Sequence, residues 1–229
     1  MIALVDFDGV LMDTETQYSR FWDETGRKYL NIEGFGSIIK GQTLKQIFGK
    51  HFSDFSESEL RTIEEALNGY ESRMSYDFIP GAREFLHELK NAGVQTAIVT
   101  SSNDMKMSHV YKVHPQLHTM VDGILTSEHF SKSKPDPECF LKGIETLGGS
   151  PASTIVFEDS IHGITAGRAA GAYVVGLATT NKREVIEPLC DMVIDNFSEF
   201  SLKDLILYII LLLQHLRPLH LLQPCGLRS

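Results

Sequence analysis

Two aspartates, Asp6 and Asp8, directly follow the first apolar segment of the chain. The short, partly β-branched segment before Asp6 predicts a buried strand. On an extended chain two residues that are two apart point to the same side, and Gly9 then allows the chain to turn away. Buried carboxylates are costly unless a positive group joins them. The pair therefore indicates a divalent cation, a phosphate with its counter-charges, or both.

Composition narrows the class of protein. The chain has 229 residues, of which 42% are hydrophobic and 22% charged, as in a globular protein. A net charge of −9 without a basic run argues against a nucleic-acid partner and requires locally placed cations for an anionic substrate. Three widely spaced cysteines and the absence of a signal peptide predict a cytoplasmic protein without a disulfide or zinc framework.

Strand and helix patterns alternate along most of the chain, which predicts an α/β fold with a Rossmann-like open parallel sheet. After the first strand, we expect strands at Gln95–Val99, Gly123–Leu125, Thr154–Phe157, Tyr173–Leu177 and Met192–Ile194. The helices between them are expected at Ala82–Asn91, Pro137–Leu147 and Ile161–Ala170. Ligands on such sheets bind beyond the carboxyl ends of the strands.

One connection is much longer than a simple crossover. About 85 residues separate the first two strands, and they contain no convincing strand pattern. A capping box at Ser56–Glu59 predicts a helix within them. We interpret residues 14–80 as a helical cap above the two aspartates, and residues 1–13 with 81–203 as the α/β core. The remaining tail, residues 204–229, contains a nine-residue apolar run that is too short to span a bilayer, and we assign it no role.

Four segments with polar or charged residues follow predicted strands or precede predicted helices. Singly, each has a plainer explanation, such as a turn, a helix cap or a solvated loop. Their order along one sheet edge makes a joint site the better interpretation. The segments are Asp6–Glu15, Val99–Asn103, Lys132–Pro137 and Phe157–Gly163.

Together the four segments resemble, in order, spacing and residue type, the motifs of the haloacid dehalogenase superfamily. The resemblance covers roughly residues 1–200. The first segment is similar to the branch that contains β-phosphoglucomutase and phosphatases with a helical cap. A single Asp-x-Asp would be weak evidence, whereas four ordered motifs are specific.

The resemblance implies phosphoryl transfer with Mg²⁺ as the cofactor. Asp6 is then the nucleophile that forms an aspartyl-phosphate, and Asp8 is the acid and base for the leaving oxygen and for water. The metal ligands would be Asp6, the backbone carbonyl of Asp8, Asp159, and Glu158 through water. These hard oxygen ligands suit Mg²⁺, which neutralises the transferring oxygens.

The same resemblance implies the groups that hold phosphate. Thr100, through its hydroxyl, and Ser101, through its backbone N–H, would bind the phosphoryl group, with Ser102 and Asn103 beside them. Lys134 would tie that group to the Asp6 carboxylate and offset its charge. A dehalogenase is disfavoured, because the acid pairs serve phosphate and metal.

The predicted cap carries the substrate question. In the mutase a Lys-Gly-x-Ser-Arg segment grips the sugar phosphate, and the corresponding segment here begins at Lys40 but has Leu44 at the arginine position. Lys45 is displaced by one residue from that position. Thr14 resembles the hinge residue that tunes Asp8 as the cap opens. We therefore expect Lys40 and Thr14 to act on the substrate side of the site.

The leading hypothesis is a Mg²⁺-dependent phosphatase that acts on a small phosphorylated metabolite such as a sugar phosphate. A β-phosphoglucomutase-like isomerase is the second hypothesis. Phosphonate cleavage would require Lys40 to form a Schiff base. A catalytically idle binding module is an alternative of another class, although the complete motif set argues against it. A response-regulator receiver does not fit the length, the insert or the motif order. No membrane span is expected, and the sequence leaves the oligomeric state open.

Overall fold

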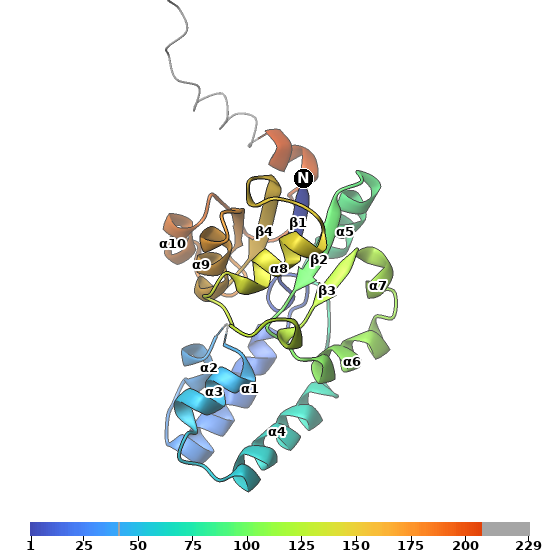
Figure 1. Ribbon diagram of the computed structural model, residues 1–229. Helices are drawn as coiled ribbons and strands as arrows, with labels where there is room; N and C mark the ends of the chain where they lie inside the picture. The colour runs from blue at the N-terminus through green and yellow to red at the C-terminus, as the bar shows by residue number, and fades with distance from the viewer. Residues whose placement is uncertain (41, 208–229) are drawn as a thin grey trace, which may run out of the picture.

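A single parallel sheet forms the centre of the protein. The computed structural model describes residues 1–40 and 42–207 (Figure 1). All neighbouring strands pair in parallel, in the order β3-β2-β1-β4-β5-β6. The strands are β1 (Ile2–Val5), β2 (Gln95–Val99), β3 (Gly123–Leu125), β4 (Thr154–Glu158), β5 (Tyr173–Leu177) and β6 (Met192–Ile194). The predicted α/β fold with an open parallel sheet is confirmed.

Helices connect these strands and cover both faces of the sheet. Those of the region between β1 and β2 are α1 (Glu15–Thr25), α2 (Phe35–Ile38), α3 (Leu44–His51), α4 (Glu57–Glu71) and α5 (Ala82–Asn91), with a π-helical turn at Gly26–Leu30. The later helices are α6 (Asp104–Val113), α7 (Leu117–Met120), α8 (Glu138–Thr146), α9 (Ile161–Ala169) and α10 (Arg183–Ile186), with short 3₁₀ turns at Ser127–His129, Pro151–Ser153 and Glu187–Leu189.

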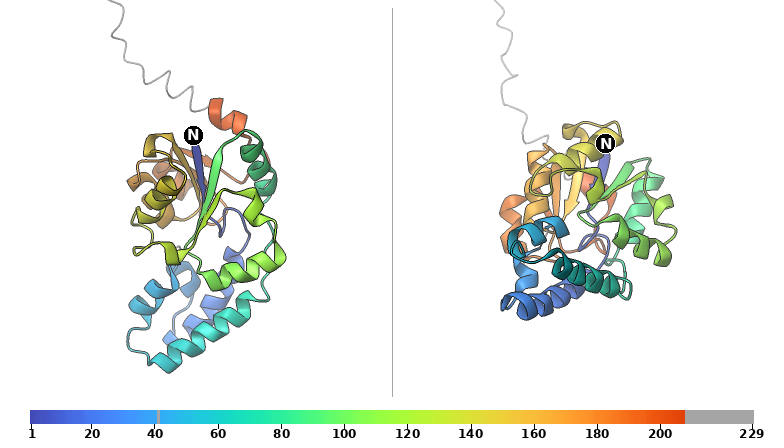
Figure 2. Two further views of the ribbon diagram at one scale, coloured as in Figure 1. Left: turned by 45° about the vertical axis from the view of Figure 1, so that its right-hand side comes forward. Right: turned by 60° about the horizontal axis from the view of Figure 1, so that its bottom comes forward.

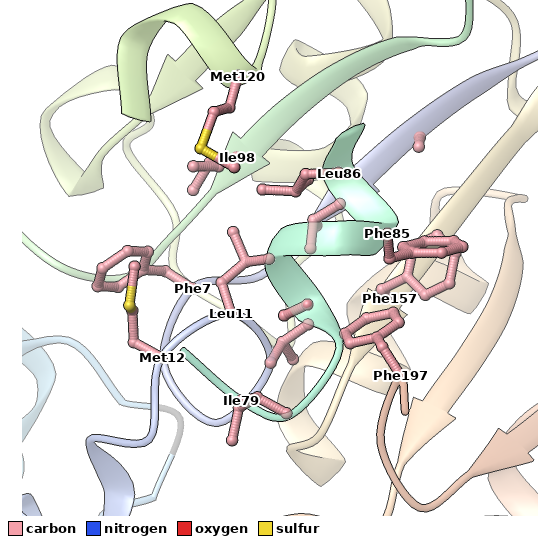
Figure 3. Packing of buried hydrophobic residues seen from close by; sticks show 14 of the residues in the cluster. Phe7, Leu11, Met12, Ile79, Phe85, Leu86, Ile98, Met120, Phe157 and Phe197 are labelled. Carbon is pink, nitrogen blue, oxygen red and sulfur yellow. The ribbon is translucent and has the colours of Figure 1, made fainter. Parts of the chain in front are cut away.

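The alternation of side chains along β1 divides the core into two layers. Ala3 and Val5 belong to the layer covered by α5, α6 and α7, whereas Ile2 and Leu4 belong to the layer covered by α8, α9 and α10. In the first layer Phe85 of α5 lies flat against Phe197, with ring centroids 4.8 Å apart (Figure 3). Both faces of the sheet are therefore dry, and a polar group of the strands reaches a ligand only at their ends.

The inserted helices α1 to α4 have an apolar cluster of their own. Its buried members are all drawn from residues 21–67 and are rich in aromatic rings: Phe21, Trp22, Phe35, Ile39, Ile47, Phe52, Ile63 and Leu67. Figures 1 and 2 show these helices gathered at one end of the sheet. The capping box between Ser56 and Glu59 is confirmed at the start of α4. The division into a core and a cap at residues 13/14 and 80/81 stays a prediction.

Two short chain segments join the inserted helices to the sheet. They are hydrogen-bonded to each other, because Ile79 donates to the Leu11 carbonyl and Asp13 donates to the Asp77 carbonyl, both at 2.9 Å. Beyond the sheet, Leu202 and Leu205 are buried against the first layer of the core. The predicted apolar tail continues outside the described residues, from 208 to 229.

Within residues 1–40 and 42–207, no helix combines the length and the apolar character that a bilayer crossing needs. The expected absence of a membrane span agrees with this finding for that part of the chain. The cytoplasmic location, the absence of a nucleic-acid partner and the oligomeric state are not tested by the fold.

Candidate active site

A cavity of about 540 Å³ lies between the carboxyl ends of the strands and the inserted helices. The sheet contributes its floor, which includes Asp6, Asp8 and Lys134. The inserted helices contribute the opposite wall, which includes Trp22 and Lys40. Residues from all four predicted motifs line this cavity, so the structure brings together groups that are more than 150 positions apart in the sequence.

A buried lysine links two acids at the cavity floor. The Lys134 ammonium lies 2.8 Å from Asp6 Oδ1 and 2.6 Å from Glu158 Oε1, and it also donates to the Val99 carbonyl at 3.3 Å. Only 2% of Lys134 is exposed. Burial alone would lower the pKa of this lysine, but the two carboxylates raise it above its usual value. Lys134 therefore stays charged and sets the orientation of the Asp6 carboxylate.

Glu158 is held from both sides at the end of β4. Its Oε2 accepts the backbone N–H groups of Asp159 and Ser160, both at 2.9 Å, while Oε1 accepts from Lys134. The approach of α9 makes this arrangement possible, because a side chain at Gly163 would overlap the Glu158 carboxylate. These hydrogen bonds fix the Glu158 carboxylate, which in turn orients the Lys134 ammonium.

Three carboxylates converge at one point of the floor. One oxygen from each of Asp6, Glu158 and Asp159 lies within 4.8 Å of the other two, and all three residues are buried. Burial raises the pKa of Asp6 to about 7, with the Lys134 charge acting against this rise. Burial and the neighbouring Glu158 also raise the pKa of Asp159 well above its usual value. The raised pKa values of Asp6 and Asp159 show that buried negative charge is unfavourable at this point. A cluster of three carboxylates that offers only oxygen ligands fits a divalent cation such as Mg²⁺.

Gly9 allows the first loop to pass close to these acids. Its φ is +75°, and a side chain there would overlap the carboxylate of Asp159. Thr179 donates its hydroxyl to the Gly9 carbonyl at 2.5 Å, and Asn181 donates to the Asp159 carbonyl at 2.8 Å. The loop after β5 therefore braces both the first motif and the fourth.

Asp8 is surrounded by three donors. Thr14 and Lys106 both donate to its Oδ1, and the Ser102 hydroxyl donates to its Oδ2 at 2.7 Å. Burial would raise the pKa of Asp8, but the Lys106 charge and these hydrogen bonds lower it below its usual value. Thr14, expected on the substrate side, contacts Asp8 and is not among the residues that line the cavity. Asp8 is an anion in this arrangement, ready to accept a proton.

The second motif lies at the end of β2. The Thr100 oxygen accepts the Ser102 N–H at 3.0 Å, which leaves the Thr100 hydroxyl hydrogen free to donate. The hydroxyl oxygen of Ser101 is buried in the cavity wall without a partner among the described residues. Asn103 caps α6 by accepting the Lys106 N–H at 2.9 Å. Thr100 and Ser101 therefore have donor capacity to spare, whereas Ser102 is engaged with Asp8 and Asn103 with the helix.

The opposite wall contains the predicted cap residue Lys40. Its ammonium lies 3.9 Å from Glu15 Oε2, and its carbonyl oxygen is 3.1 Å from Nδ1 of His162. Thr43 and Ser133 join the inserted helices to the core through their hydroxyls at 3.1 Å. Burial, with the neighbouring Asp8 charge, raises the pKa of Glu15 to about 7. These contacts place Lys40 at the cavity but leave its ammonium only loosely paired.

Sequence reasoning missed Lys106, which is 3% exposed and lies against Asp8. A signal was present, because asparagine is a residue type that favours helix N-caps, and Asn103 at the N-cap places Lys106 in the first turn of the following helix. A cation there opposes the helix dipole, and its side chain points back toward the end of the preceding strand. A lysine in that position is unfavourable for the helix alone.

Comparisons with known proteins agree with this arrangement. The family model of haloacid dehalogenase-like hydrolases matches residues 3–187. Among curated relatives, a validoxylamine A 7′-phosphate phosphatase of Streptomyces hygroscopicus subsp. limoneus is 29% identical, over 81% of this chain and 89% of the relative. A β-phosphoglucomutase of Mycobacterium bovis is 25% identical, over 79% and 82% of the two chains.

Among solved structures, a family IA, variant 3 haloacid dehalogenase hydrolase from Entamoeba histolytica superposes with a TM-score of 0.78. It is 25% identical and covers 91% of this chain and 99% of its own. The sheet order, the acids at its carboxyl edge and the match over most of the chain lead to one conclusion. This chain belongs to the haloacid dehalogenase-like hydrolases.

Proposed function

We propose that this protein is a Mg²⁺-dependent phosphatase that hydrolyses a small phosphorylated metabolite through an aspartyl-phosphate. The observation that carries the proposal is the environment of Asp6 at the cavity floor. Its carboxylate is oriented by the buried Lys134 and lies next to two further buried acids that fit a cation. An anionic nucleophile approaches a phosphate dianion only where positive charge is concentrated in this way.

The reaction follows from the residues in two balanced steps. Asp8, an anion before the substrate binds, first takes up a proton from solvent. An oxygen of Asp6 then attacks phosphorus, the bond from phosphorus to the leaving oxygen breaks, and Asp8 gives that oxygen its proton. Water then attacks the phosphorus of the aspartyl-phosphate and gives a proton to Asp8, which releases inorganic phosphate and regenerates Asp6. Thr100 and Ser101 hold the phosphoryl oxygens throughout, using the donors that the structure leaves free.

The metal would be held by Asp6, the backbone carbonyl of Asp8, Asp159 and Glu158. Because both carboxylate oxygens of Glu158 already accept hydrogen bonds, Glu158 would contact the metal through a water molecule. Bound Mg²⁺ would supply charge neutralisation at the transferring oxygens. Lys134 supplies a fixed part of that positive charge whether or not the ion is bound.

The substrate is proposed from the cavity and the relatives. A volume of about 540 Å³ suits a metabolite-sized ligand. The phosphatase relative acts on a phosphorylated small molecule, as its name states. At the position where the mutase has an arginine, this chain has Leu44, which lines the cavity but binds no phosphate. A monophosphate, attached through its single phosphate to the cavity floor, is therefore favoured over a bisphosphate.

The test is phosphate release from a panel of about a hundred phosphate monoesters, with Mg²⁺ and with chelator. We expect turnover that needs Mg²⁺ and disappears in Asp6→Asn, because the nucleophile is lost. Asp54→Asn, at an exposed position on the inserted helical region, is the matched control and should leave the rate unchanged. No turnover in wild type, with Asp6→Asn indistinguishable from it, would favour an idle binding module instead.

A phosphosugar isomerase is the second candidate, and the similarity to a β-phosphoglucomutase together with Lys40 in the cavity wall favours it. A mutase holds a bisphosphate in two orientations and so needs a second phosphate grip. Conversion of a hexose 1-phosphate to the 6-phosphate without free phosphate would support it and contradict the phosphatase. Phosphonate cleavage through Lys40 predicts a lysine adduct that borohydride traps, and no adduct excludes it.

A further inference from the structure

Lys106 occupies a place that neither metal binding nor phosphate binding explains. It is 3% exposed, and its ammonium donates to Asp8 Oδ1 and to the Ser102 hydroxyl, the latter at 2.8 Å. The Ser102 hydroxyl in turn donates to Asp8 Oδ2 at 2.7 Å. Lys106 therefore reaches one carboxylate oxygen directly and the other through Ser102, which restrains the carboxylate against rotation.

Aromatic rings hold the ammonium from the sides. It lies 4.3 Å from the ring centre of Tyr18 and 5.5 Å from that of Phe7. Tyr18 in turn donates its hydroxyl to Glu71 Oε1 at 2.6 Å. Phe7 belongs to the first motif, whereas Tyr18 and Glu71 belong to α1 and α4 of the insertion. The lysine is thus enclosed by both walls of the cavity, which reduces the number of positions available to its ammonium.

Stability alone does not account for this lysine. It lies in the first turn of α6, where a cation opposes the helix dipole, and it must be removed from water. The Asp8 carboxylate is its ion-pair partner. Replacing such a buried pair by apolar groups is often neutral or stabilising, so the pair is better explained by what it does to Asp8.

We propose that Lys106 is a positioning residue that holds the Asp8 carboxyl group where it exchanges a proton with the leaving oxygen. This inference rests on the proposed function, because it assumes that Asp8 is the acid in phosphoryl transfer. Lys106 itself touches neither the reacting phosphorus nor the leaving oxygen in this role. Its loss should therefore matter only for reactions that need Asp8.

Esters with different leaving groups distinguish reactions that need a proton from Asp8 from reactions that do not. An alkoxide needs a proton from Asp8 as it departs, whereas p-nitrophenolate leaves readily without one. The parameter kcat/KM reports steps up to the first irreversible one, which is transfer to Asp6, and so it excludes the later hydrolysis of the aspartyl-phosphate. We therefore compare kcat/KM for p-nitrophenyl phosphate with kcat/KM for glycerol 1-phosphate in Lys106→Met. Lys112→Met, on the exposed end of the same helix, is the matched control.

We expect Lys106→Met to lower kcat/KM for the alkyl ester by about 10²-fold, the cost of a misplaced catalytic group, and to change the aryl ester little. Asp8→Asn should show the same selectivity, and adding Lys106→Met to it should cost nothing further, because the two residues act as one unit. Lys106→Arg, which also donates to a carboxylate, should recover part of the loss. Lys112→Met should match wild type on both esters.

Equal losses on both esters would overturn the inference, since Lys106 would then act on phosphate binding or on the fold. A full additional loss in the Asp8→Asn background would also overturn it. If Lys106→Met does not fold, as judged by thermal unfolding, Lys106→Arg decides by the same comparison of the two esters. If wild type hydrolyses no alkyl or aryl ester of the phosphate monoester panel with Mg²⁺, the proposed function fails, an outcome distinct from a selective failure of Lys106.

Discussion

Replacing Lys134 with methionine removes a cation that Asp6 and Glu158 share. In the wild type its ammonium lies 2.8 Å and 2.6 Å from their oxygens, and Lys134 and Glu158 are almost fully buried. Breaking a buried pair by removing one partner costs about 3–5 kcal/mol, because a buried charge loses its partner. For a domain of this size 1 kcal/mol corresponds to about 2–4 °C in Tm, so Lys134→Met should lower the Tm by roughly 6–20 °C.

Thermal unfolding with chelator measures this loss directly. Without the Lys134 charge, which lowers the pKa of Asp6 in the wild type, that pKa rises further in the folded state. Between the pKa of Asp6 in the unfolded chain and its pKa in the folded state, the folded protein then binds more protons than the unfolded chain. Stability then falls as pH increases, and the Tm loss of Lys134→Met should be larger at pH 8 than at pH 5. Added Mg²⁺ should restore part of the lost stability, because a divalent cation offsets the same carboxylates.

The matched control is Lys142→Met on α8. Lys142 also pairs with an acid, lying 3.3 Å from Glu138, but 42% of its side chain is exposed. Exposed ion pairs contribute about 0–1 kcal/mol to stability, so the Tm of Lys142→Met should lie less than about 4 °C below that of the wild type at either pH. A Tm loss in Lys134→Met no larger than that of the control, or one independent of pH, would refute the electrostatic account of the cavity floor.

Three further predictions follow from the same geometry. Burial raises the pKa of Asp6 to about 7, so the stability of the metal-free wild type should fall as pH rises from 4 to 7. Mg²⁺ should then raise the Tm more at pH 8 than at pH 5. A Tm increase independent of pH would argue against Mg²⁺ binding at Asp6 and its neighbouring acids. Gly163→Ala should displace the Glu158 carboxylate and lower both the Tm and the rate of phosphate release. The control Gly49→Ala, with open space around it in α3, should leave that rate unchanged and raise the free energy of unfolding by up to about 1 kcal/mol. Leu44→Arg should lower the KM for hexose bisphosphates relative to monophosphates, measured by phosphate release; an unchanged ratio would mean that Leu44 does not face the distal part of the substrate.

The strands were predictable because each is a short apolar run at the period of a buried parallel sheet. Gln95–Val99 is found with the predicted bounds, and Gly93 before it has the positive φ of a helix end. The last residue of β4, Glu158, was not predicted within the strand, because its side chain is charged and its burial depends on Lys134. Burial of a charge is a property of the assembled site, which local sequence does not record.

Helix ends were less predictable than strand ends. The helix expected at Pro137–Leu147 runs from Glu138 to Thr146, and Pro137 is its N-cap residue. The Asp136 carboxylate accepts the Glu138 N–H at 3.0 Å, so this acid still closes the start of the helix. The helix predicted from the capping box, α4, ends at Glu71, although the apolar residue Met74 lies one turn further on at helical spacing and packs into the core. Apolar periodicity reports burial and does not by itself mark the last turn.

Site residues within the four sequence motifs were predictable. Contacts between residues far apart in the sequence and outside those motifs were not. Asp6 and Thr100 directly follow two neighbouring strands, so their convergence follows from the parallel order alone, whereas Lys134 reaches Asp6 from the loop before α8. Lys106 pairs with Asp8 across 98 positions, and its partner depends on where the first turn of α6 lies above β1. The loop after β5, with Asn181 bound to the Asp159 carbonyl, has no local signal for this contact.

The place of β1 in the sheet has a consequence for synthesis of the chain. Among the strands of this sheet it is the first to leave the ribosome, yet it lies between β2 and β4, whose residues begin at 95 and 154. Until β2 has been made both edges of the apolar segment Ile2–Val5 are unpaired, and until β4 has been made one edge still is, the condition that favours association with other chains. Asp6, at the end of that segment, therefore stays without its lysine until Lys134, 128 positions further along the chain, has been translated.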